Sequence, residues 1–268
     1  MLDRTAGSPH FTRNSTGLDV VADGLDLLAG GTLSRKELAR RLAERHPGCD
    51  GRILAGQLEL RTPLVHGAAT GAWGSRGNRS AVSVTPAEVW LGQPMATAAA
   101  KDSAKELIRR YLAAFGPAGV KDVQAWCGLT RLGEVVTEMH ELRHYSGPDG
   151  RDLIDLADAE LPDPETLAPA RLLPAFDNAL LGHADRTRII SDEDRKRVMP
   201  GRAQVRPTFL VDGWVRGTWS CDAGTLLLTP FRPLCPTDRA ALEQEANRLL
   251  PFVGGGVVAY SDLPLEQG

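Results

Sequence analysis

Apolar residues recur at helical spacing in three short stretches near the start of the chain. The first stretch covers residues 18–28, and the third covers residues 51–60. Between them, Ser34 is followed three positions later by Glu37, a spacing typical of the capping box that begins a helix. The pattern therefore predicts three consecutive helices.

Two strand-like segments follow these helices. Residues 64–66 and 81–85 flank a glycine-rich, cationic stretch at residues 67–79. Three helices and a glycine-rich hairpin are the parts of a winged helix, which we place at residues 23–95. Residues 1–22 precede this pattern and are expected to form an N-terminal arm.

The same order of elements recurs between residues 101 and 157. Residues 105–115 and 120–126 have helical patterns, and Thr130 is placed to cap a third helix. A candidate hairpin turns at residues 147–150. The recurrence predicts a second winged helix and a duplicated unit.

The pattern changes in the C-terminal part of the chain. Residues 158–170 combine acidic residues with three prolines and predict a linker without regular structure. Beyond the linker, apolar strands flank the pair Asp212-Gly213, which indicates a tight hairpin turn, and residues 237–252 predict a helix. We expect an α+β protein whose residues 171–268 form a β-rich domain with a terminal helix.

Composition adds constraints on partners. The net charge of −3 gives no general attraction for nucleic acid, which would have to be held by local basic patches. The four cysteines lie far apart without metal-ligand spacing, and neither a P-loop nor a G-x-G-x-x-G motif occurs, so we expect no metal and no cofactor. Neither a signal peptide nor a run of about 18 apolar residues is present. We expect a cytoplasmic monomer without a membrane contact.

Four stretches resemble the winged-helix family of AlkZ-like and YcaQ-like DNA glycosylases. They are YLAAFGPA at 111–118, DVQAWCGL at 122–129, LPAFDNALLGHADR at 173–186 and VDGWVRGTW at 211–219. The resemblance covers most of residues 23–252. It implies tandem winged helices followed by a small β-barrel-like domain, double-stranded DNA as the partner, and excision of bulky alkylated purines or unhooking of interstrand crosslinks.

The resemblance also implies a catalytic Gln-x-Gln or Gln-x-Asp pair, in a winged helix upstream of the matching stretches. We expect this chain to lack the pair, and whether its reading frame is truncated stays open. Gln57-Leu58-Glu59 is similar and chemically able to orient water; the alternative is an ordinary helical face. The chain is thus either a catalytically incomplete glycosylase relative or a non-catalytic DNA-binding or regulatory module.

The segment 176–188 carries an unusual density of polar residues. Its Asp177, Asn178 and His183 are candidates for lining a lesion pocket. In the alternative, Asp177 caps a helix and His183 pairs with Asp185 at a domain junction.

Cations suited to DNA phosphates gather in the predicted loop of residues 186–206 and in the winged-helix units. The alternatives are a solvated loop with local Asp/Arg pairs, and winged helices that serve as protein-protein or purely structural modules. The tryptophans Trp126, Trp214 and Trp219 are interpreted as core residues. The candidate DNA-binding residues are Arg76, Arg79, Thr130, Arg131, Arg186, Arg188, Arg195, Lys196, Arg197 and Arg202.

Overall fold

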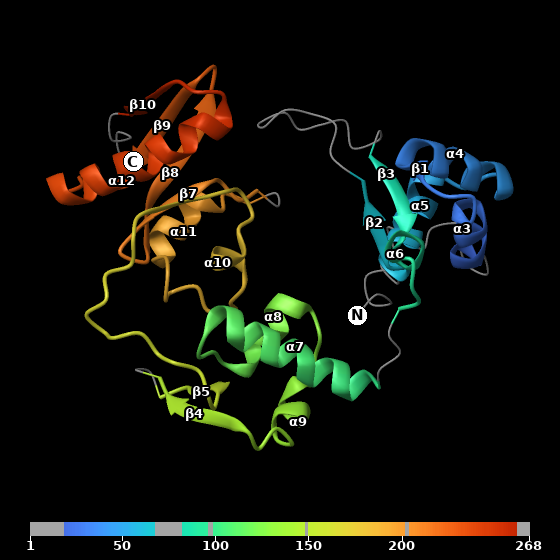
Figure 1. Cartoon of the computed structure of the whole chain (residues 1–268), viewed down its shortest axis with the longest axis horizontal. Coiled ribbons are helices and arrows are strands. Elements are labelled where there is room, and N and C mark those ends of the chain that lie inside the picture. The colour runs from blue at the N-terminus through green and yellow to red at the C-terminus, as the bar shows by residue number, and fades with distance from the viewer. Residues whose placement is uncertain (1–18, 68–81, 96–98, 148–149, 202–203, 262–268) are drawn as a thin grey trace. The chain divides into compact units, whose positions relative to one another are not determined.

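A computed structural model describes residues 19–67, 82–95, 99–147, 150–201 and 204–261 (Figure 1). The chain divides into two compact units, Met1–Thr97 and Ala98–Gly268. No helix within the described ranges is long and apolar enough to cross a membrane.

The first unit combines helices with a three-stranded antiparallel sheet of order β1-β3-β2. The helices predicted at 18–28 and 51–60 and the strands at 64–66 and 81–85 are confirmed to within a few residues, whereas β1 and α6 were not expected. The elements are α3 (Val20–Leu28), β1 (Leu33–Ser34), α4 (Arg35–Arg45), α5 (Gly51–Arg61), β2 (Leu64–His66), β3 (Ser83–Pro86) and α6 (Ala87–Leu91).

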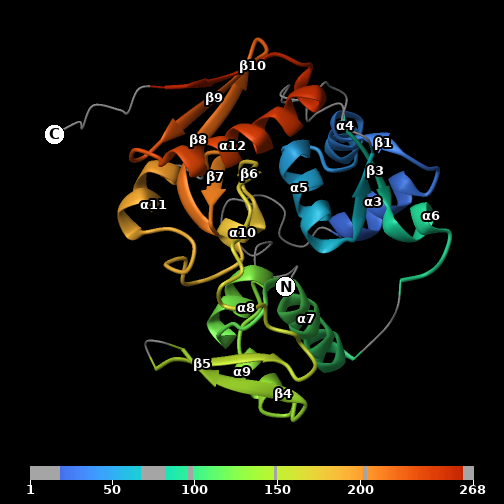
Figure 2. The ribbon, with the colours of Figure 1, turned by 60° about the vertical axis from the view of Figure 1, so that its left-hand side comes forward.

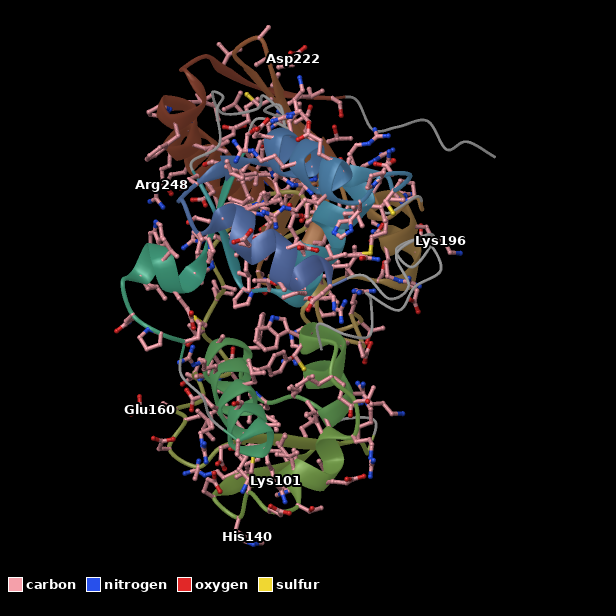
Figure 3. All side chains as sticks on the ribbon, turned by 90° about the vertical axis from the view of Figure 1, so that its right-hand side faces the viewer. Lys101, His140, Glu160, Lys196, Asp222 and Arg248 are labelled. Atoms are coloured by element: carbon pink, nitrogen blue, oxygen red, sulfur yellow. The ribbon has the colours of Figure 1, made fainter. Side chains whose placement is uncertain are left out.

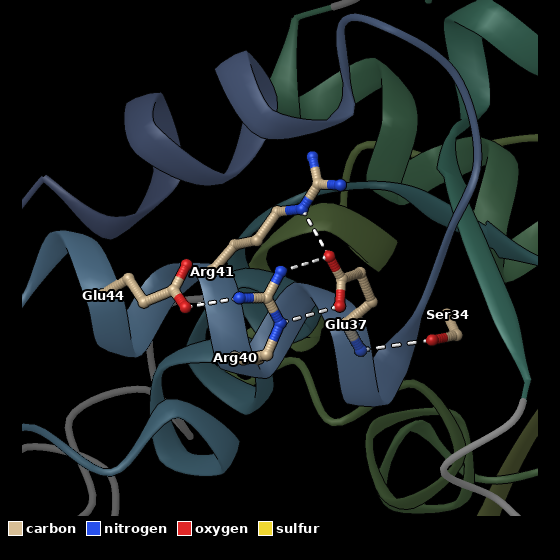
Figure 4. Close-up of polar contacts among 5 residues, drawn as sticks. All are labelled: Ser34, Glu37, Arg40, Arg41 and Glu44. Carbon is tan, nitrogen blue, oxygen red and sulfur yellow. Dashed lines mark hydrogen bonds and ion pairs between the residues drawn. The ribbon is translucent and has the colours of Figure 1, made fainter.

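The predicted cap of α4 is confirmed. The Oγ atom of Ser34 accepts a hydrogen bond from the main-chain N–H of Glu37 at 3.1 Å. The Glu37 carboxylate does not turn back to Ser34 as in a capping box; it binds the guanidinium groups of Arg40 and Arg41 (Figure 4). These two cations, Arg40 first, hold the pKa of Glu37 at about 2. The first turn of α4 is therefore fixed by a cap and by ion pairs on its outer face.

The core of this unit lies where α4 and α5 cross. A Cβ atom added at Gly51 would lie 1.9 Å from the carbonyl oxygen of Ala39, so only glycine allows α5 to begin this close to α4. The buried aliphatic side chains around the crossing are Val20, Leu28, Leu38, Leu42, Leu54, Leu58 and Val84.

The second unit begins with the same order of elements. Its first part contains α7 (Ala100–Phe115), α8 (Val120–Cys127), α9 (Leu132–Val136), β4 (Leu142–Ser146) and β5 (Asp152–Leu156). Ala118, between α7 and α8, pairs with Ile154 of β5. Leu33, between α3 and α4, pairs with Val84 of β3 in the same way. In both units the second hairpin strand returns to the segment that joins the first two helices.

The expected cap of α9 is wrong. Arg131, not Thr130, occupies the N-cap position, with a left-handed φ of 64° and no side-chain cap bond. Its guanidinium instead binds the Glu134 carboxylate at 2.8 Å. The left-handed residue moves the helix start one position along the chain. The main-chain N–H of Leu132, the first residue of α9, donates to the Oε1 atom of Gln124 at 2.9 Å.

The C-terminal part of the second unit is a five-stranded sheet of order β10-β9-β8-β7-β6, antiparallel except for the parallel pair β9 and β10. Neither helix nor strand lies between Leu156 and Arg171, as the linker prediction expected. The elements are β6 (Arg171–Leu173), α10 (Asn178–Leu181), α11 (Asp192–Val198), β7 (Thr208–Val211), β8 (Trp214–Asp222), β9 (Thr225–Pro230), α12 (Pro236–Leu249), the 3-10 helix η2 (Leu250–Val253) and β10 (Val257–Tyr260).

The sheet is open, which corrects the expectation of a barrel. Among the described strands, β6 and β10 each pair on one side only. Helix α12 packs on one face of the sheet (Figure 2). It contacts both edge strands, because Glu245 pairs with Arg171 of β6 at 3.5 Å and Arg239 lies over the ring of Tyr260 in β10. Helix α12 therefore spans the sheet from one edge strand to the other, and the sheet does not close into a barrel.

Two further details differ in how well they were predicted. The turn at Asp212-Gly213 is confirmed, and both residues have the positive φ angles, 49° and 73°, that a two-residue hairpin requires. The expected loop at 186–206 is wrong in part, because it contains the helix α11, capped by Ser191.

Candidate functional site

The polar segment that begins at Phe176 is anchored by a short helix. Asp177 caps α10, and its Oδ1 accepts a hydrogen bond from the main-chain N–H of Ala179 at 2.8 Å. Asn178, the next residue, is exposed. The structural alternative for Asp177 is thus what the geometry shows, and Asn178 has the more accessible side chain of the two.

His183 is buried against the first part of the second unit. Its Nδ1 lies 2.7 Å from the phenol oxygen of Tyr111, which also lies 2.9 Å from the carbonyl oxygen of Gly182. Because a carbonyl only accepts, both contacts are satisfied when Tyr111 donates to Gly182 and the Nδ1–H of His183 donates to Tyr111. The rings of Phe115 and Trp126 complete this aromatic cluster.

Burial shapes the protonation of this pair. It lowers the pKa of His183, and the nearby Arg188 guanidinium lowers it further. Burial also raises the pKa of Tyr111, with the Asp122 carboxylate as the second cause. Both side chains are therefore neutral at physiological pH. The alternative in which His183 pairs with Asp185 is wrong, because the ring hydrogen-bonds to Tyr111 instead.

Asp122 fastens the same segment and was missed by sequence reasoning. Its Oδ1 accepts hydrogen bonds from the main-chain N–H groups of Ala184 at 2.9 Å and Asp185 at 3.2 Å. Its Oδ2 accepts one from Gly119 at the start of α8, also at 2.9 Å. The spacing Gly119-x-x-Asp122 signals a helix start, but nothing local signals the partners 62 and 63 positions away.

The two arginines beyond this joint bind main-chain oxygens. Arg186 donates to the carbonyl of Leu180 at 3.0 Å, and Arg188 donates to the carbonyl of Pro117, also at 3.0 Å. The nearby Asp185 is occupied by Thr187 and by an ion pair with Arg151. The main-chain and side-chain groups of Thr187, followed by Arg151, lower the pKa of Asp185.

The carboxylates of α11 are also occupied. Asp194 binds Arg232 at 2.7 Å, and Glu193 binds the same guanidinium at 3.1 Å. Asp192 pairs with Arg195 at 3.2 Å. Arg232 lies outside the segment, so its pairs with Glu193 and Asp194 offset negative charge of α11 without using a cation of the segment. The pair of Asp192 with Arg195 lies within α11 and leaves the net charge of the segment unchanged.

The basic residues of the segment divide into two groups. Arg195 and Arg197 are ion-paired, and Arg197 also approaches the carbonyl oxygen and the ring of Phe231. Lys196 is exposed and extends away from α11 (Figure 3). Four cations of this stretch have no carboxylate partner among the described residues: Arg186, Arg188, Lys196 and Arg206.

The remaining candidate DNA-binding residues do not join the cations of residues 186–206 in the described part of the chain. Thr130 and Arg131 are exposed at the start of α9. Arg76, Arg79 and Arg202 lie outside the described residues.

The tryptophan prediction was right for Trp219, which is buried and donates from Nε1 to the carbonyl of Leu173 at 2.8 Å. Trp126 is half-buried in the aromatic cluster, whereas the prediction was wrong for Trp214, which is 43% exposed. Within the described ranges, no group of three metal-ligating side chains is gathered.

The pair Gln57 and Glu59 is not presented to solvent for catalysis. Gln57 is only 4% exposed. Both carboxylate oxygens of Glu59 accept hydrogen bonds from the guanidinium of Arg35, the shorter of them at 2.5 Å. These contacts tie α5 to the first residue of α4, which favours a structural interpretation.

Comparison with known proteins gives consistent matches. A family model described as DNA glycosylase AlkZ-like matches residues 4–252. The interstrand DNA cross-link repair glycosylase of Streptomyces sahachiroi is 27% identical over 239 residues, covering 82% of this chain and 62% of that protein. The solved structure of Streptomyces sahachiroi DNA glycosylase AlkZ has a TM-score of 0.74 at 24% identity, covering 96% of this chain and 74% of that one. The chain thus spans less than two thirds of this curated relative, and the structural likeness concerns the fold.

Proposed function

Because the chain belongs to the AlkZ-like DNA glycosylase family, we propose that it binds double-stranded DNA as a monomer. The contacts are made by the hairpins of the two winged-helix units and the start of α9, with α7 directed away from the DNA, and by the cationic surface, which we define as Arg186, Arg188, Lys196 and Arg206. The observation that carries this proposal is that these cations have no carboxylate partner among the described residues. The neighbouring carboxylates Asp185, Asp192, Glu193 and Asp194 are each ion-paired with another arginine.

The winged-helix assignment is supported by topology. Each unit has a helix, a short pairing segment, two further helices and a hairpin. The pairs Leu33 with Val84 and Ala118 with Ile154 occupy equivalent places in the two units. Helix α5 takes the place of a recognition helix, but several of its residues are buried and Arg52, at its start, pairs with Asp50. Base reading by α5 is therefore not part of the proposal.

The cationic surface is suited to the DNA backbone. Each phosphate neutralised by a lysine or arginine releases counterions, which makes binding favourable and dependent on salt. Arg186 and Arg188 are held by carbonyl oxygens, so their positions are fixed while their charge stays uncompensated. Contacts of this kind position a protein on DNA without selecting a base sequence.

The catalytic step is a separate matter. The 268 residues contain no Gln-x-Gln and no Gln-x-Asp pair, and Gln57 and Glu59 are engaged within the fold. We therefore assign no water-activating residue in this sequence. Excision of bulky alkylated purines or crosslink unhooking is the second candidate function, and it rests on family membership; a purely regulatory DNA-binding module is the alternative.

Binding is tested by fluorescence anisotropy with a labelled duplex. The double variant Arg188→Ala/Lys196→Ala should bind about tenfold or more weakly than the wild type, since two phosphate contacts are lost. The matched control Lys101→Ala/Arg110→Ala removes the same charge from α7, where both cations are ion-paired. Equal weakening in both variants would show that only net charge matters and would overturn the cationic surface.

Catalysis is tested with a duplex that carries a bulky N7-alkylated guanine. Our assignment predicts that any base released by the purified chain is released equally by Gln57→Ala. Release that disappears in Gln57→Ala, with folding and DNA affinity retained, would make Gln57 catalytic and contradict the assignment.

A further inference from the structure

An exposed tryptophan begins strand β8. Trp214 directly follows the Asp212-Gly213 turn, and its side chain is 43% exposed. The next residue, Val215, is buried in a cluster with Leu180 and Phe231. Val215 therefore anchors the start of the strand, while the large aromatic ring beside it stays partly in solvent. Since burial of such a ring is strongly favourable, an exposed indole offers a surface to a ligand.

A pocket of about 400 Å³ lies beside this indole. Its volume is within the range of small-ligand sites, and it suits a single nucleotide and not a duplex. The polar and aromatic residues that line it are Trp214 and Arg216 of β8, Ser191, Glu193 and Asp194 of α11, and Arg232.

Arg216 carries the uncompensated charge of this pocket. Arg232 binds Asp194 at 2.7 Å and Glu193 at 3.1 Å, and Arg197 approaches Glu193 at 3.6 Å. Two arginines thus balance the two carboxylates. Arg216 is exposed and has no carboxylate partner in the described part of the chain. The pocket therefore combines an open aromatic ring with a guanidinium that is available to an anion.

The main chain beneath the pocket is held in place. The N–H of Val215 donates to the carbonyl of Ile189 at 2.9 Å, and the N–H of Phe231 donates to the carbonyl of Arg216, also at 2.9 Å. The indole and the guanidinium thus stand on a fixed strand. A fixed site loses less conformational entropy when it binds a ligand.

Helix α11 links the pocket to the cationic surface. Asp194 lines the pocket, and Lys196 follows two positions later on the same helix. A helix of seven residues is about 10 Å long, so a DNA backbone held at Lys196 has neighbouring nucleotides within reach of the pocket. The pocket can therefore take a nucleotide from the strand that the cationic surface holds.

We infer that this pocket binds an unpaired nucleotide of DNA, whose base stacks on the indole of Trp214 and whose phosphate binds the guanidinium of Arg216. The inference rests on the proposed function. The base faces inside a duplex are covered by the neighbouring base pairs, so only a base outside the stack can contact Trp214. Because every base has such a face, the pocket selects unpaired structure and not sequence.

The test measures fluorescence anisotropy of the full chain with two labelled duplexes of the same sequence. One duplex is fully paired, and the other carries a single extra adenine without a partner. The wild type should bind the second duplex about tenfold more tightly, as expected for one stacked base. Trp214→Ala should reduce this ratio of affinities to about one, whereas Trp214→Phe, which keeps an aromatic ring, should retain part of it.

Two further variants complete the test. Trp90→Ala removes another exposed tryptophan, 65% exposed on α6, and should leave the ratio unchanged. Arg216→Gln should lower the ratio, and the salt dependence of its binding to the unpaired adenine duplex should be weaker by about one phosphate contact.

The possible failures are distinguishable. Equal affinity of the wild type for the two duplexes would overturn the inference, and so would a preference that survives in Trp214→Ala. Both results leave binding to the paired duplex, and with it the proposed function, in place. Absence of binding to either duplex would overturn the proposed function and the inference together.

Discussion

The phenol oxygen of Tyr111 and the Nδ1 atom of His183 lie 2.7 Å apart, although 72 positions separate the two residues in the chain. The contact joins α7 to the segment that follows α10. Together with the bonds of Asp122 to Ala184 and Asp185, it fastens the repeated helical part of the second unit to its β-rich part.

Removing the phenol oxygen should destabilise the second unit. Tyr111→Phe leaves the carbonyl of Gly182 and the Nδ1–H of His183 without partners, which costs about 1–3 kcal/mol of unfolding free energy. Urea denaturation measures the loss. Tyr145→Phe, at a half-buried position on β4, is the control and should change stability by no more than about 0.5 kcal/mol. Equal stability of the two variants would contradict the role of Tyr111.

The lowered pKa of His183 predicts that the protein loses stability in mild acid. Its folded pKa is below the ordinary value of 6.5 because burial and Arg188 disfavour the charged ring. Above 6.5 the ring is neutral in both states and its full contribution is present. As the pH falls through 6.5, the unfolded chain takes up a proton that the folded chain resists, so the free energy of unfolding decreases.

The measurement compares urea midpoints at pH 7.5 and pH 5.5. The wild type should lose more stability between them than His183→Gln, which has no proton to gain at this position. His140→Gln, at an exposed position, should behave like the wild type. An identical acid loss in the wild type and in His183→Gln would show that His183 does not titrate as described.

Replacing Asp122 should lower the free energy of unfolding by more than the loss of an ordinary helix cap does. Asp122→Ala leaves three main-chain N–H groups without their acceptor and should cost about 3 kcal/mol. Asp122→Asn keeps one oxygen acceptor, so its loss should be intermediate. A loss of about 1 kcal/mol or less for the alanine variant is typical of a simple helix cap. It would show that the bonds of Asp122 to Ala184 and Asp185 do not stabilise the fold.

Two glycines on helices should respond in opposite ways to alanine. In Gly51→Ala the new methyl group meets the Ala39 carbonyl at 1.9 Å, so α4 and α5 must separate, at a cost of about 3 kcal/mol or more. In Gly133→Ala nothing lies within 4 Å of the added atom, and α9 should gain up to about 1 kcal/mol. Thermal unfolding of both variants tests this prediction. An unchanged melting temperature in Gly51→Ala would contradict the close contact between α4 and α5 at Gly51.

Local patterns in the sequence were enough to predict much of the fold. The Ser34 cap, the helix near 51–60 and the Asp212-Gly213 turn depend on neighbours only a few positions away. Helix α11 was missed because its seven residues are mostly charged, although the spacing of Ser191 and Asp194 is that of a cap.

What the sequence could not show depends on distant partners. Strand β10 forms by parallel pairing with β9 some thirty residues earlier, and nothing in Val-Val-Ala-Tyr indicates that partner. In the candidate site, Asp122 and Tyr111 gain their roles from residues 183–185. The charge around the cationic surface also depends on two arginines outside residues 176–206. Arg151 pairs with Asp185, and Arg232 pairs with Asp194.

The salt dependence of DNA affinity tests the central proposal most directly. If Arg188 and Lys196 each contact a phosphate, the slope of log affinity against log salt concentration should be smaller by about 2 in Arg188→Ala/Lys196→Ala than in the wild type. The slope of Lys101→Ala/Arg110→Ala should match that of the wild type. Identical slopes for the wild type and the Arg188/Lys196 variant would contradict DNA binding by the cationic surface.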